Sequence, residues 1–456
     1  MLSKFKIKNL FGNRDIHIDF KDSCVILVGE NGLGKTTILH MLYCLLSHDY
    51  SSLLKYEFEE IEVKIKERKE KWLSFSSLVL RKFIIDRNNL KGDLGGDAEA
   101  LKEIEDHFRR SCINMFEDND ILSDPVINKH RWGINTDLYA DISSLLGAYR
   151  NIYELEGYIK LLHLDIIYLP TYRRIEKSES FISSSYPEDY NNFPLRKAVK
   201  TDGIQHLSSK RYDEKPPRDF LKFGMGDVRA KIDGLLQIIR NRTYLEFKSI
   251  SAKTLHHILN FEKEGYEVEF DLEKVQVVIN RLGNLLMEED KTRLLNSVSS
   301  GEFKKTPFVG YYLGELYNVY KKESYIDQSL SDFCESCNKF LIGKYLLYNE
   351  SNLTLNLFIK RKEQEDKAVS LDVLSSGEKQ IVSILAYFYL NHKNIFMIID
   401  EPEISISIYW QKLLLPELLK AHSCKYLIAA THSPFIYSND LESCAIGPRE
   451  YVSFRD

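Results

Sequence analysis

One short segment of the chain combines the residue types that hold a polyphosphate. It consists of Gly29, Glu30, Asn31, Gly32, Leu33, Gly34, Lys35, Thr36 and Thr37. Its glycines permit positive-φ turns that aim backbone N–H groups inward, and a helix starting after them adds its positive N-terminal dipole. Lys35 would reach the β- and γ-phosphates, and the Thr36 hydroxyl would be a ligand for Mg²⁺. The segment therefore predicts a loop that binds a nucleoside triphosphate with Mg²⁺.

The residues on either side of this loop support the same interpretation. An apolar run, Cys24 to Val28, precedes the loop, and apolar residues at helical spacing follow it: Ile38, Met41, Leu42 and Leu45. A chance glycine-rich turn is the alternative, but it would not require a strand before it and a helix after it. The elements that should position the loop are therefore a buried strand and the helix that follows.

A pair of carboxylates follows a second apolar run, Phe396 to Ile399. Asp400, at the end of this predicted strand, can hold Mg²⁺ through a water molecule. Glu401 can orient and deprotonate the attacking water, which makes it the first catalytic candidate, beside Lys35. The alternative is a strand that simply ends in acidic turn residues. The presence of a phosphate loop in the same chain favours the functional interpretation.

A third motif, Leu374 to Gln380, contains Ser375, Ser376, Gly377 and Glu378. A helix N-terminus at this point would form a second anion site, complementary to a γ-phosphate. The pattern alone is weak, because Ser375 and Glu378 also form an ordinary capping box. The same four residue types recur at Ser299 to Glu302, where no strand ending in Asp-Glu follows closely. That second occurrence predicts a helix start and nothing more.

His432 is the remaining catalytic candidate. It lies in the sequence Thr431-His432-Ser433-Pro434, directly after a predicted buried strand. A lone histidine is usually structural. At the end of the strand that follows the acidic pair, however, this one could sense a γ-phosphate.

The periodicity of the chain predicts an α/β fold with alternating strands and helices. Strands are expected between Lys4 and Phe20 (two, with a turn at Asn9–Arg14), at Tyr56–Lys66, Phe75–Ile85, Ile166–Leu169, Leu353–Ile359, Ile395–Ile399 and Tyr426–Ala430. Helices are expected at Gly377–Leu390 and Trp410–Leu419, and a charged hairpin tip at Glu67–Lys71. Residues 1–95 and 348–456 should form the two halves of one nucleotide-binding core. Residues 96–347 should form a mainly helical insert whose strand at 166–169 returns to the core.

Within the insert, no heptad pattern persists, so we expect a compact helical lobe and not a long coiled coil. Arg173 and Arg174 could approach a phosphate or a neighbouring subunit, although arginines after a strand are more often solubility residues. The polar stretch Ser180–Ser209 predicts a long loop. Cys334 and Cys337 form a C-x-x-C pair without the second pair or nearby histidines that a zinc site needs, so we expect two ordinary helical cysteines.

Composition limits the class of protein further. The chain has 456 residues, of which 44% are hydrophobic, and a formal net charge of −5. This charge gives no overall basic signature for nucleic-acid binding. No apolar run approaches the ~20 residues of a membrane span, and the seven cysteines are scattered. We therefore expect a cytoplasmic protein in a reducing compartment, without a membrane association.

The four motifs in this order resemble the ABC-type P-loop ATPases, in the branch of structural-maintenance (SMC), RecF-like recombination-repair and OLD-like proteins, of the AAA_15 class. The resemblance implies an ATPase head with a mixed sheet, an antiparallel N-terminal β region and a large helical insert, and ATP and Mg²⁺ as cofactors. It also implies that residues 375–378 act in trans on ATP in a second subunit of a head-to-head dimer. Their distance along the chain from Lys35 disfavours a membrane-transporter ATPase. Only a short segment follows His432, so a nuclease would have to be a separate chain.

Four segments, Lys8–Phe20, Tyr168–Ser178, Leu374–Gln380 and Ile398–Gln411, are similar to the stand-alone ATPases of bacterial anti-phage systems. The nearest types are the PtuA ATPases of Septu and retron systems and the AriA ATPases of PARIS. The resemblance implies a slow ATPase that forms higher oligomers, controls a separate HNH or TOPRIM nuclease, and responds to a phage-derived trigger or to DNA. Two alternatives stay open: a RecF/SMC-like repair ATPase that acts directly on DNA, and a structural oligomer with ATP as a folding ligand.

Overall fold

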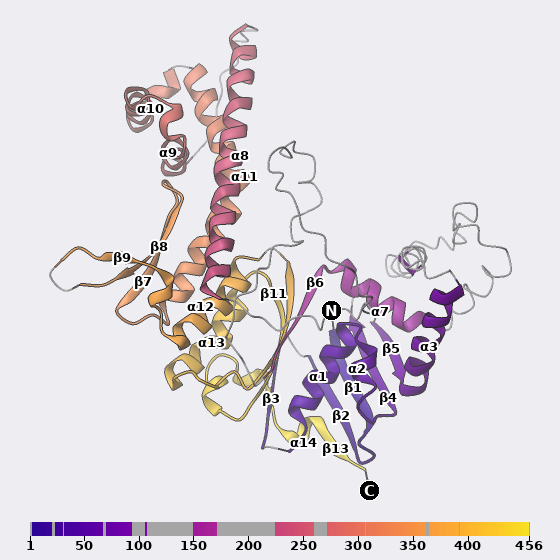
Figure 1. The fold of residues 1–456 in the computed structure, drawn as a ribbon. Coiled ribbons are helices and arrows are strands. Elements are labelled where there is room, and N and C mark those ends of the chain that lie inside the picture. Colours follow the sequence, from indigo (N-terminus) through magenta and orange to yellow (C-terminus); the bar gives the residue numbers. More distant parts are fainter. Residues whose placement is uncertain are drawn as a thin grey trace, which may run out of the picture.

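The computed structural model describes most of the chain in eleven stretches. They are residues 2–20, 23–30, 32–66, 70–93, 105–106, 149–170, 224–259, 271–305, 307–361, 364–391 and 393–455. Asn31, Arg173, Arg174 and the polar stretch 180–209 lie outside these residues. The described part consists of an α/β head with two five-stranded sheets, a small third sheet and a long helical arm (Figure 1).

The first sheet is antiparallel and contains both ends of the chain. Its strands are β1 (Leu2–Leu10), β2 (Arg14–Asp19), β4 (Glu60–Lys66), β5 (Glu70–Ser76) and β13 (Val452–Phe454), in the order β13-β2-β1-β4-β5. Phe5 and Ile7 alternate with lysines and are fully buried, as are Ile16 and Ile18 across the hairpin. The two strands predicted between Lys4 and Phe20 are therefore confirmed, because this alternation leaves one face for the core.

The strand predicted at Phe75–Ile85 is wrong in its bounds. Strand β5 ends at Ser76, and helix α3 (Ser77–Asp93) takes up the rest of the apolar run. Leu80 and Phe83 are buried at helical spacing, whereas Leu78 and Ile85 are exposed. Of the predicted charged tip, Glu70 and Lys71 belong to β5, and residues 67–69 lie outside the described residues. A short apolar run is compatible with the period of a strand and with the period of a helix, and here packing selected the helix.

The second sheet is parallel and forms the centre of the head. It contains β12 (Ala445–Ile446), β3 (Cys24–Val28), β11 (Cys424–Thr431), β10 (Asn394–Asp400) and β6 (Leu164–Leu169), in that order. Strand β10 is buried throughout except at Asn394, which agrees with the predicted parallel-sheet strand. The strand predicted at Ile166–Leu169 is also confirmed, because β6 pairs with β10 in parallel.

Alternate residues of the parallel sheet enter two separate cores. Phe396 and Ile398 pack in the core that contains helix α1 (Lys35–Leu46), together with the antiparallel sheet. Met397 and Ile399 pack in the other core, with helices α12 (Ser376–Tyr389) and α13 (Ile408–Lys420). Since successive strand residues point to opposite faces, α1 and α12 lie on opposite faces of this sheet. Helix α7 (Arg150–Leu161) belongs to the α1 side.

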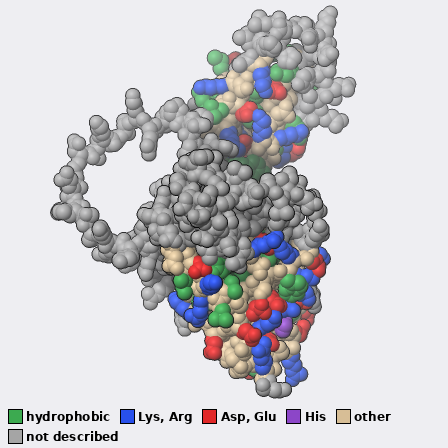
Figure 2. All heavy atoms as spheres, turned by 90° about the vertical axis from the view of Figure 1, so that its right-hand side faces the viewer, with side chains coloured by type: hydrophobic (Ala, Val, Ile, Leu, Met, Phe, Trp, Pro, Cys, Tyr) green, Lys and Arg blue, Asp and Glu red, His purple; other side chains and the backbone are tan. Residues whose placement is uncertain are grey.

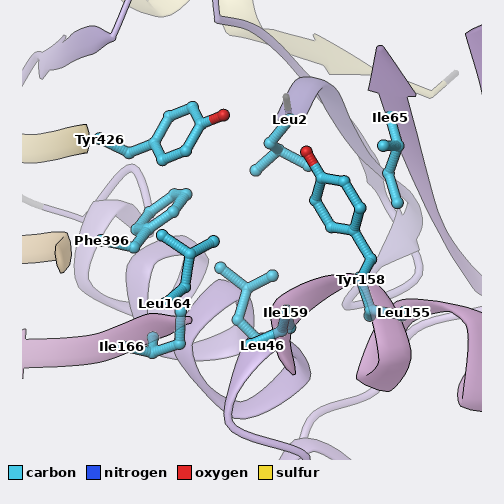
Figure 3. Close-up of a pocket in the computed structure, with 10 residues that line it drawn as sticks. All are labelled: Leu2, Leu46, Ile65, Leu155, Tyr158, Ile159, Leu164, Ile166, Phe396 and Tyr426. Carbon is cyan, nitrogen blue, oxygen red and sulfur yellow. The ribbon is translucent and has the colours of Figure 1, made fainter. Parts of the chain in front are cut away.

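The α1-side core is closely packed around one small cavity of about 10 Å³. Figure 3 shows that its lining is made of aliphatic and aromatic side chains, including Leu46, Leu164 and Phe396. A space of this size is about one water molecule, which is too small for a ligand. It is a packing defect and not a ligand site.

The helical arm extends away from the sheets (Figure 1), and its described residues form four α-helices. They are α8 (Met225–Leu259), α9 (Leu272–Arg281), α10 (Glu288–Ser300) and α11 (Pro307–Asn338). Helices α8 and α11 pack against each other, and a third hydrophobic core lies among the arm helices. The 32 residues of α11 span about 50 Å at 1.5 Å per residue. The expected compact lobe is therefore corrected to an elongated helical arm.

A small antiparallel sheet connects the arm to the head. It contains β7 (Lys344–Asn349), β8 (Thr354–Ile359) and β9 (Lys367–Val369). Cys334 and Cys337 lie buried on α11 as free thiols, so the expected helical placement of this pair is confirmed. Among the described residues, no group of three or more His, Cys, Asp and Glu side chains is placed to hold a metal ion. The described helices include none that is long and apolar enough to cross a bilayer.

Candidate functional site

The glycine-rich loop connects β3 to α1, as predicted from the flanking residues. Gly34 is the N-cap of α1 and has a φ of 83°, and Gly32 has a φ of 88°. These left-handed conformations favour glycine. At Gly29 the reason is close packing, since an added Cβ would lie 2.8 Å from Leu33 Cδ1 and 2.9 Å from Pro448 Cγ. Gly32 and Gly34 thus have the backbone conformation typical of a phosphate-binding turn, and Gly29 allows close packing beside it.

Lys35 occupies the centre of this site and is 6% exposed. Its ammonium donates to the carbonyl oxygens of Gly29 (2.6 Å) and Glu30 (2.9 Å) and to His432 Nε2 (3.0 Å). Because an ammonium can only donate, the Nε2 atom accepts in this contact. Burial lowers the pKa of Lys35, although the carboxylates of Asp400, Glu401 and Glu403 act in the opposite direction. A phosphate would therefore meet a partly desolvated cation.

Thr36 meets the end of strand β10 on the other side of Lys35. Its hydroxyl donates to Asp400 Oδ2 at 2.8 Å, and Asp400 is 1% exposed. The parallel order β3-β11-β10 brings together the carboxyl ends of strands that are hundreds of residues apart in the chain. A hydroxyl and a carboxylate are oxygen ligands of the kind that Mg²⁺ prefers, and Mg²⁺ usually takes few protein ligands. The pair therefore fits Mg²⁺ beside a phosphate.

Glu401 follows Asp400 in an unusual backbone conformation, with a φ of 48°. Its N–H donates to the Ala430 carbonyl at 2.8 Å, and its Oε1 lies 3.8 Å from His432 Nε2. Left-handed backbone at a non-glycine residue costs about 1–3 kcal/mol and is common at functional sites. The turn thus carries the second carboxylate to the same point as Lys35 and His432.

The third motif lies elsewhere in the same chain. Ser375 caps helix α12, and Glu378 completes the capping box with a hydrogen bond from Ser375 N at 2.7 Å. Ser376 is exposed at the helix N-terminus. No hydrogen bond among the described residues joins Ser375, Ser376, Gly377 or Glu378 to the glycine-rich loop. Since α1 and α12 lie on opposite faces of the sheet, one chain does not assemble all four motifs through direct contacts.

Two residues that the sequence did not single out also belong to this site. Glu403 accepts hydrogen bonds from the backbone N–H groups of His432 (2.8 Å) and Ser433 (3.2 Å). Arg14, between the rings of Phe11 and Phe454, donates to the Leu33 carbonyl at 3.3 Å. The signal for Glu403 was a third carboxylate after the Asp-Glu pair. The sequence contained no comparable signal for Arg14, because this residue lies in the predicted turn Asn9–Arg14.

Two family models match the chain. The first, AAA ATPase domain, matches residues 1–202. The second, "AAA domain, putative AbiEii toxin, Type IV TA system", matches residues 122–438. Among curated proteins, no relative matches.

Solved structures similar to the chain include SMC head domains. A Pyrococcus furiosus Smc head with an extended coiled coil, bound to the C-terminal domain of ScpA, is 12% identical over 98% of this chain and 92% of its own, with a TM-score of 0.34. A Pyrococcus yayanosii Smc head with a coiled coil and joint is 12% identical over 98% of this chain and 94% of its own, with a TM-score of 0.30. The α/β ATPase-domain fold predicted from the sequence, with a mixed set of parallel and antiparallel sheets, agrees with the two AAA family models and with the observed sheet order.

Proposed function

Because the chain belongs to the AAA-domain family whose model spans residues 122–438, we propose that it binds ATP with Mg²⁺ and hydrolyses ATP slowly. One observation carries this proposal: Lys35 and Thr36 contact residues from the far end of the chain. The contacts are 3.0 Å from Lys35 Nζ to His432 Nε2 and 2.8 Å from Thr36 Oγ1 to Asp400 Oδ2. Phosphate, metal and water-activating groups are therefore concentrated at one point.

Each residue has a distinct role in the proposed reaction. The loop N–H groups and Lys35 bind the phosphates, and Thr36 and Asp400 hold Mg²⁺, with Asp400 acting directly or through water. The bound metal neutralises phosphate charge. Glu401 orients the attacking water and accepts its proton, while His432 contacts the γ-phosphate. Lys35 must exchange at least one of its present hydrogen bonds for a phosphate oxygen.

The proposed site is completed by a second copy of the chain. Ser375, Ser376, Gly377 and Glu378 of one copy close over the ATP on the loop of the other, which gives a head-to-head dimer. Two features support this arrangement: the exposed N-terminus of α12, and its position on the sheet face opposite α1. A helix N-terminus is suited to a γ-phosphate.

Two single variants test the chemistry. Glu401→Gln should keep ATP binding but lose turnover, because the amide cannot accept the proton. Lys35→Ala should lose both ATP binding and turnover. Isothermal titration for binding and phosphate release for turnover provide the measurements. Normal hydrolysis by Lys35→Ala, or failure of Glu401→Gln to bind ATP, would show that the site assignment is wrong.

A mixing experiment tests the two-chain site. Lys35→Ala and Ser376→Arg chains are each inactive in the proposal, but a dimer of the two contains one intact site. Mixed dimers isolated with two different affinity tags should therefore recover activity. No recovery in verified mixed dimers would contradict the shared site, but it would not contradict ATP binding by the wild-type loop.

We further propose that this ATPase controls a separate nuclease, of HNH or TOPRIM type, in anti-phage defence, as a scaffold that assembles beyond the dimer and responds to a phage-derived trigger. Two observations support it: the helical arm extends away from the sheets that carry the ATP site (Figure 1), and the family description reads "putative AbiEii toxin, Type IV TA system". Mass spectrometry of proteins that co-purify from the intact native operon tests it. A stoichiometric nuclease would support the proposal.

A partner-free chain whose ATPase rate rises with DNA would instead support a repair ATPase. The net charge of −5 does not favour that alternative. On the face drawn in Figure 2, acidic and basic side chains of the described residues are interspersed. DNA binding of the repair type should weaken steeply with added salt.

A further inference from the structure

The turn after β10 contains a carboxylate that the proposed reaction does not use. Glu403 lies two residues after Glu401, and its Oε1 accepts from the N–H groups of His432 (2.8 Å) and Ser433 (3.2 Å). Its Oε2 is buried and has no hydrogen-bond partner among the described residues. Burying a carboxylate is costly unless hydrogen bonds or charges compensate it. The position therefore calls for a specific role.

Further hydrogen bonds attach the same loop to the same turn. The Ser433 hydroxyl donates to Gln411 Oε1 at 2.6 Å. Gln411 Nε2 in turn donates to the carbonyl oxygens of Ile406 (3.2 Å) and Glu403 (3.4 Å). The loop that carries His432 is thus held by a side chain from the turn and by one from helix α13. None of these contacts involves the His432 ring, which faces Lys35 and Glu401.

The negative charge of Glu403 suits this place for two reasons. A carboxylate that accepts from backbone N–H groups makes stronger hydrogen bonds than a neutral acceptor. Glu403 also supports the ammonium form of Lys35, against the effect of burial on that lysine. Lys35 Nζ and His432 Nε2 lie 3.0 Å apart. The Glu403 side chain therefore acts on both partners of this contact, because it anchors the His432 loop and favours the charged form of Lys35.

We infer that Glu403 is a positioning residue that fixes the His432 loop to the turn carrying Glu401. The inference rests on the proposed ATPase function and deepens it. With the loop fixed, His432 and Glu401 keep one relative position. The histidine that contacts the γ-phosphate and the carboxylate that activates the water are then both correctly placed at the same time. Without Glu403 the loop can shift, and a misplacement of about 1 Å can lower a rate about a hundredfold.

The first test is kinetic. Glu403→Ala should lower kcat about tenfold to a hundredfold and change the KM for ATP less than about threefold. Glu403→Gln keeps an acceptor oxygen but loses the charge, so kcat should fall at least about threefold less than in Glu403→Ala. Glu417→Ala is the matched control, because Glu417 is also a buried carboxylate, paired with Lys339 and Lys420. It should lower stability without changing kcat. Equal loss in the Ala and Gln variants would overturn the role as an acceptor.

A double variant tests whether Glu403 acts through His432. If it does, Glu403→Ala combined with His432→Ala should be no slower than His432→Ala alone, within about twofold. Multiplied losses would overturn the inference and give Glu403 an independent role.

Hydrogen exchange tests the anchor without any reference to catalysis. In Glu403→Ala, the amides of residues 432–433 should exchange at least about tenfold faster than in the wild type, while those of β10 stay unchanged. Unchanged exchange would overturn the anchor. If the wild type proved inactive toward ATP, the proposed function would fail, but this measurement would still decide whether Glu403 holds the loop.

Discussion

The same four residues, Ser-Ser-Gly-Glu, occur in two regions of this molecule with opposite structural outcomes. In the arm copy, Ser299 to Glu302, the segment ends helix α10, and Gly301 is its left-handed C-cap with a φ of 72°. In the head copy, Ser375 to Glu378, the segment starts helix α12, and Ser375 is its N-cap. The arm copy therefore ends an α-helix where a helix start was predicted, and only a short 3₁₀ helix, Glu302–Lys305, begins at its last residue. Identical local sequence did not determine which end of a helix forms.

The preceding residues explain the difference. In the arm copy, α10 is already helical, so the Ser299 hydroxyl donates back to the Leu295 carbonyl at 2.9 Å. In the head copy, Leu374 is extended and buried, so the Ser375 side chain is available to accept from the Glu378 N–H. A serine hydroxyl can cap an N–H group or bond to a carbonyl one turn earlier, and the neighbouring structure decides between them.

The largest expected difference between the copies concerns activity. Ser376 and Ser300 are both exposed, so arginine can replace either without disturbing a core. Ser376→Arg should lower ATP turnover at least about a hundredfold, because the bulky cation blocks the anion site proposed at the α12 N-terminus. Ser300→Arg should change turnover less than about twofold. Phosphate-release assays measure both, and equal effects would contradict a specific role for the head copy.

Backbone conformation should give the next largest effect. Gly301→Ala should destabilise the arm by roughly 1–2 kcal/mol, because an alanine at a φ of 72° is strained. Gly301→Asn should cost less, since asparagine tolerates this conformation better. Hydrogen exchange of the α10 amides is the measurement. A Gly301→Ala variant as protected as the wild type would show that the C-cap conformation is not required.

Removal of the cap should distinguish the copies at the level of single serines. Ser375→Ala should cost about 1 kcal/mol, because the Glu378 N–H loses its side-chain acceptor. Ser299→Ala removes only a bond to a carbonyl one turn earlier and should stay within about 0.5 kcal/mol of the wild type. Urea unfolding measures both variants. Equal losses would mean that the Ser375 cap adds nothing to α12.

The smallest effect should be a pH dependence of the head copy. Burial raises the pKa of Glu378, but the Lys344 ammonium and the Ser375 hydrogen bonds outweigh it, so the pKa lies below the ordinary 4.5. A carboxyl pKa lowered by folding stabilises the protein above the unfolded value and loses that contribution as the pH falls through the folded value. The stability difference between wild type and Glu378→Gln should therefore shrink from pH 7 to below pH 4.5.

Urea unfolding across this pH range measures the difference, and Lys344→Met provides the control. In that background, the pH dependence of the Glu378→Gln effect should be smaller, because the main favourable charge is gone. A difference that stays constant with pH in the wild-type background would contradict the lowered pKa of Glu378.

Regular patterns made much of the head predictable. The strand before the glycine-rich loop, the strand that ends at Asp400 and the helix that starts at Ser376 all agree with the sequence pattern. Each of these elements has a clear hydrophobic period or an apolar run with defined ends. Each is also short enough for the conformational preference of its own residues to determine its structure. Lys35, Thr36 and Asp400 lie next to the ends of the two strands, so their proximity followed from a parallel sheet.

The errors occurred where local preference allowed two outcomes. The apolar run after Phe75 fits a strand or a helix, and its helix is stabilised by Leu80 and Phe83 in the α1-side core. The arm lacks a heptad repeat, yet α8 and α11 pack along each other through tertiary contacts. Neither outcome depends on a short-range signal, because the packing partners are far apart in the chain.

By itself, the sequence determined the identity of the chemical groups: a glycine-rich loop with Lys35 and Thr36, two carboxylates after a buried strand, and a histidine after the next. These follow from residue type and nearest neighbours, which are local properties. Tertiary structure alone decided that Glu403 holds the His432 loop and that α12 lies on the face opposite α1. Hydrogen bonds and buried surfaces between distant segments selected those outcomes, and no short stretch of sequence contains both partners.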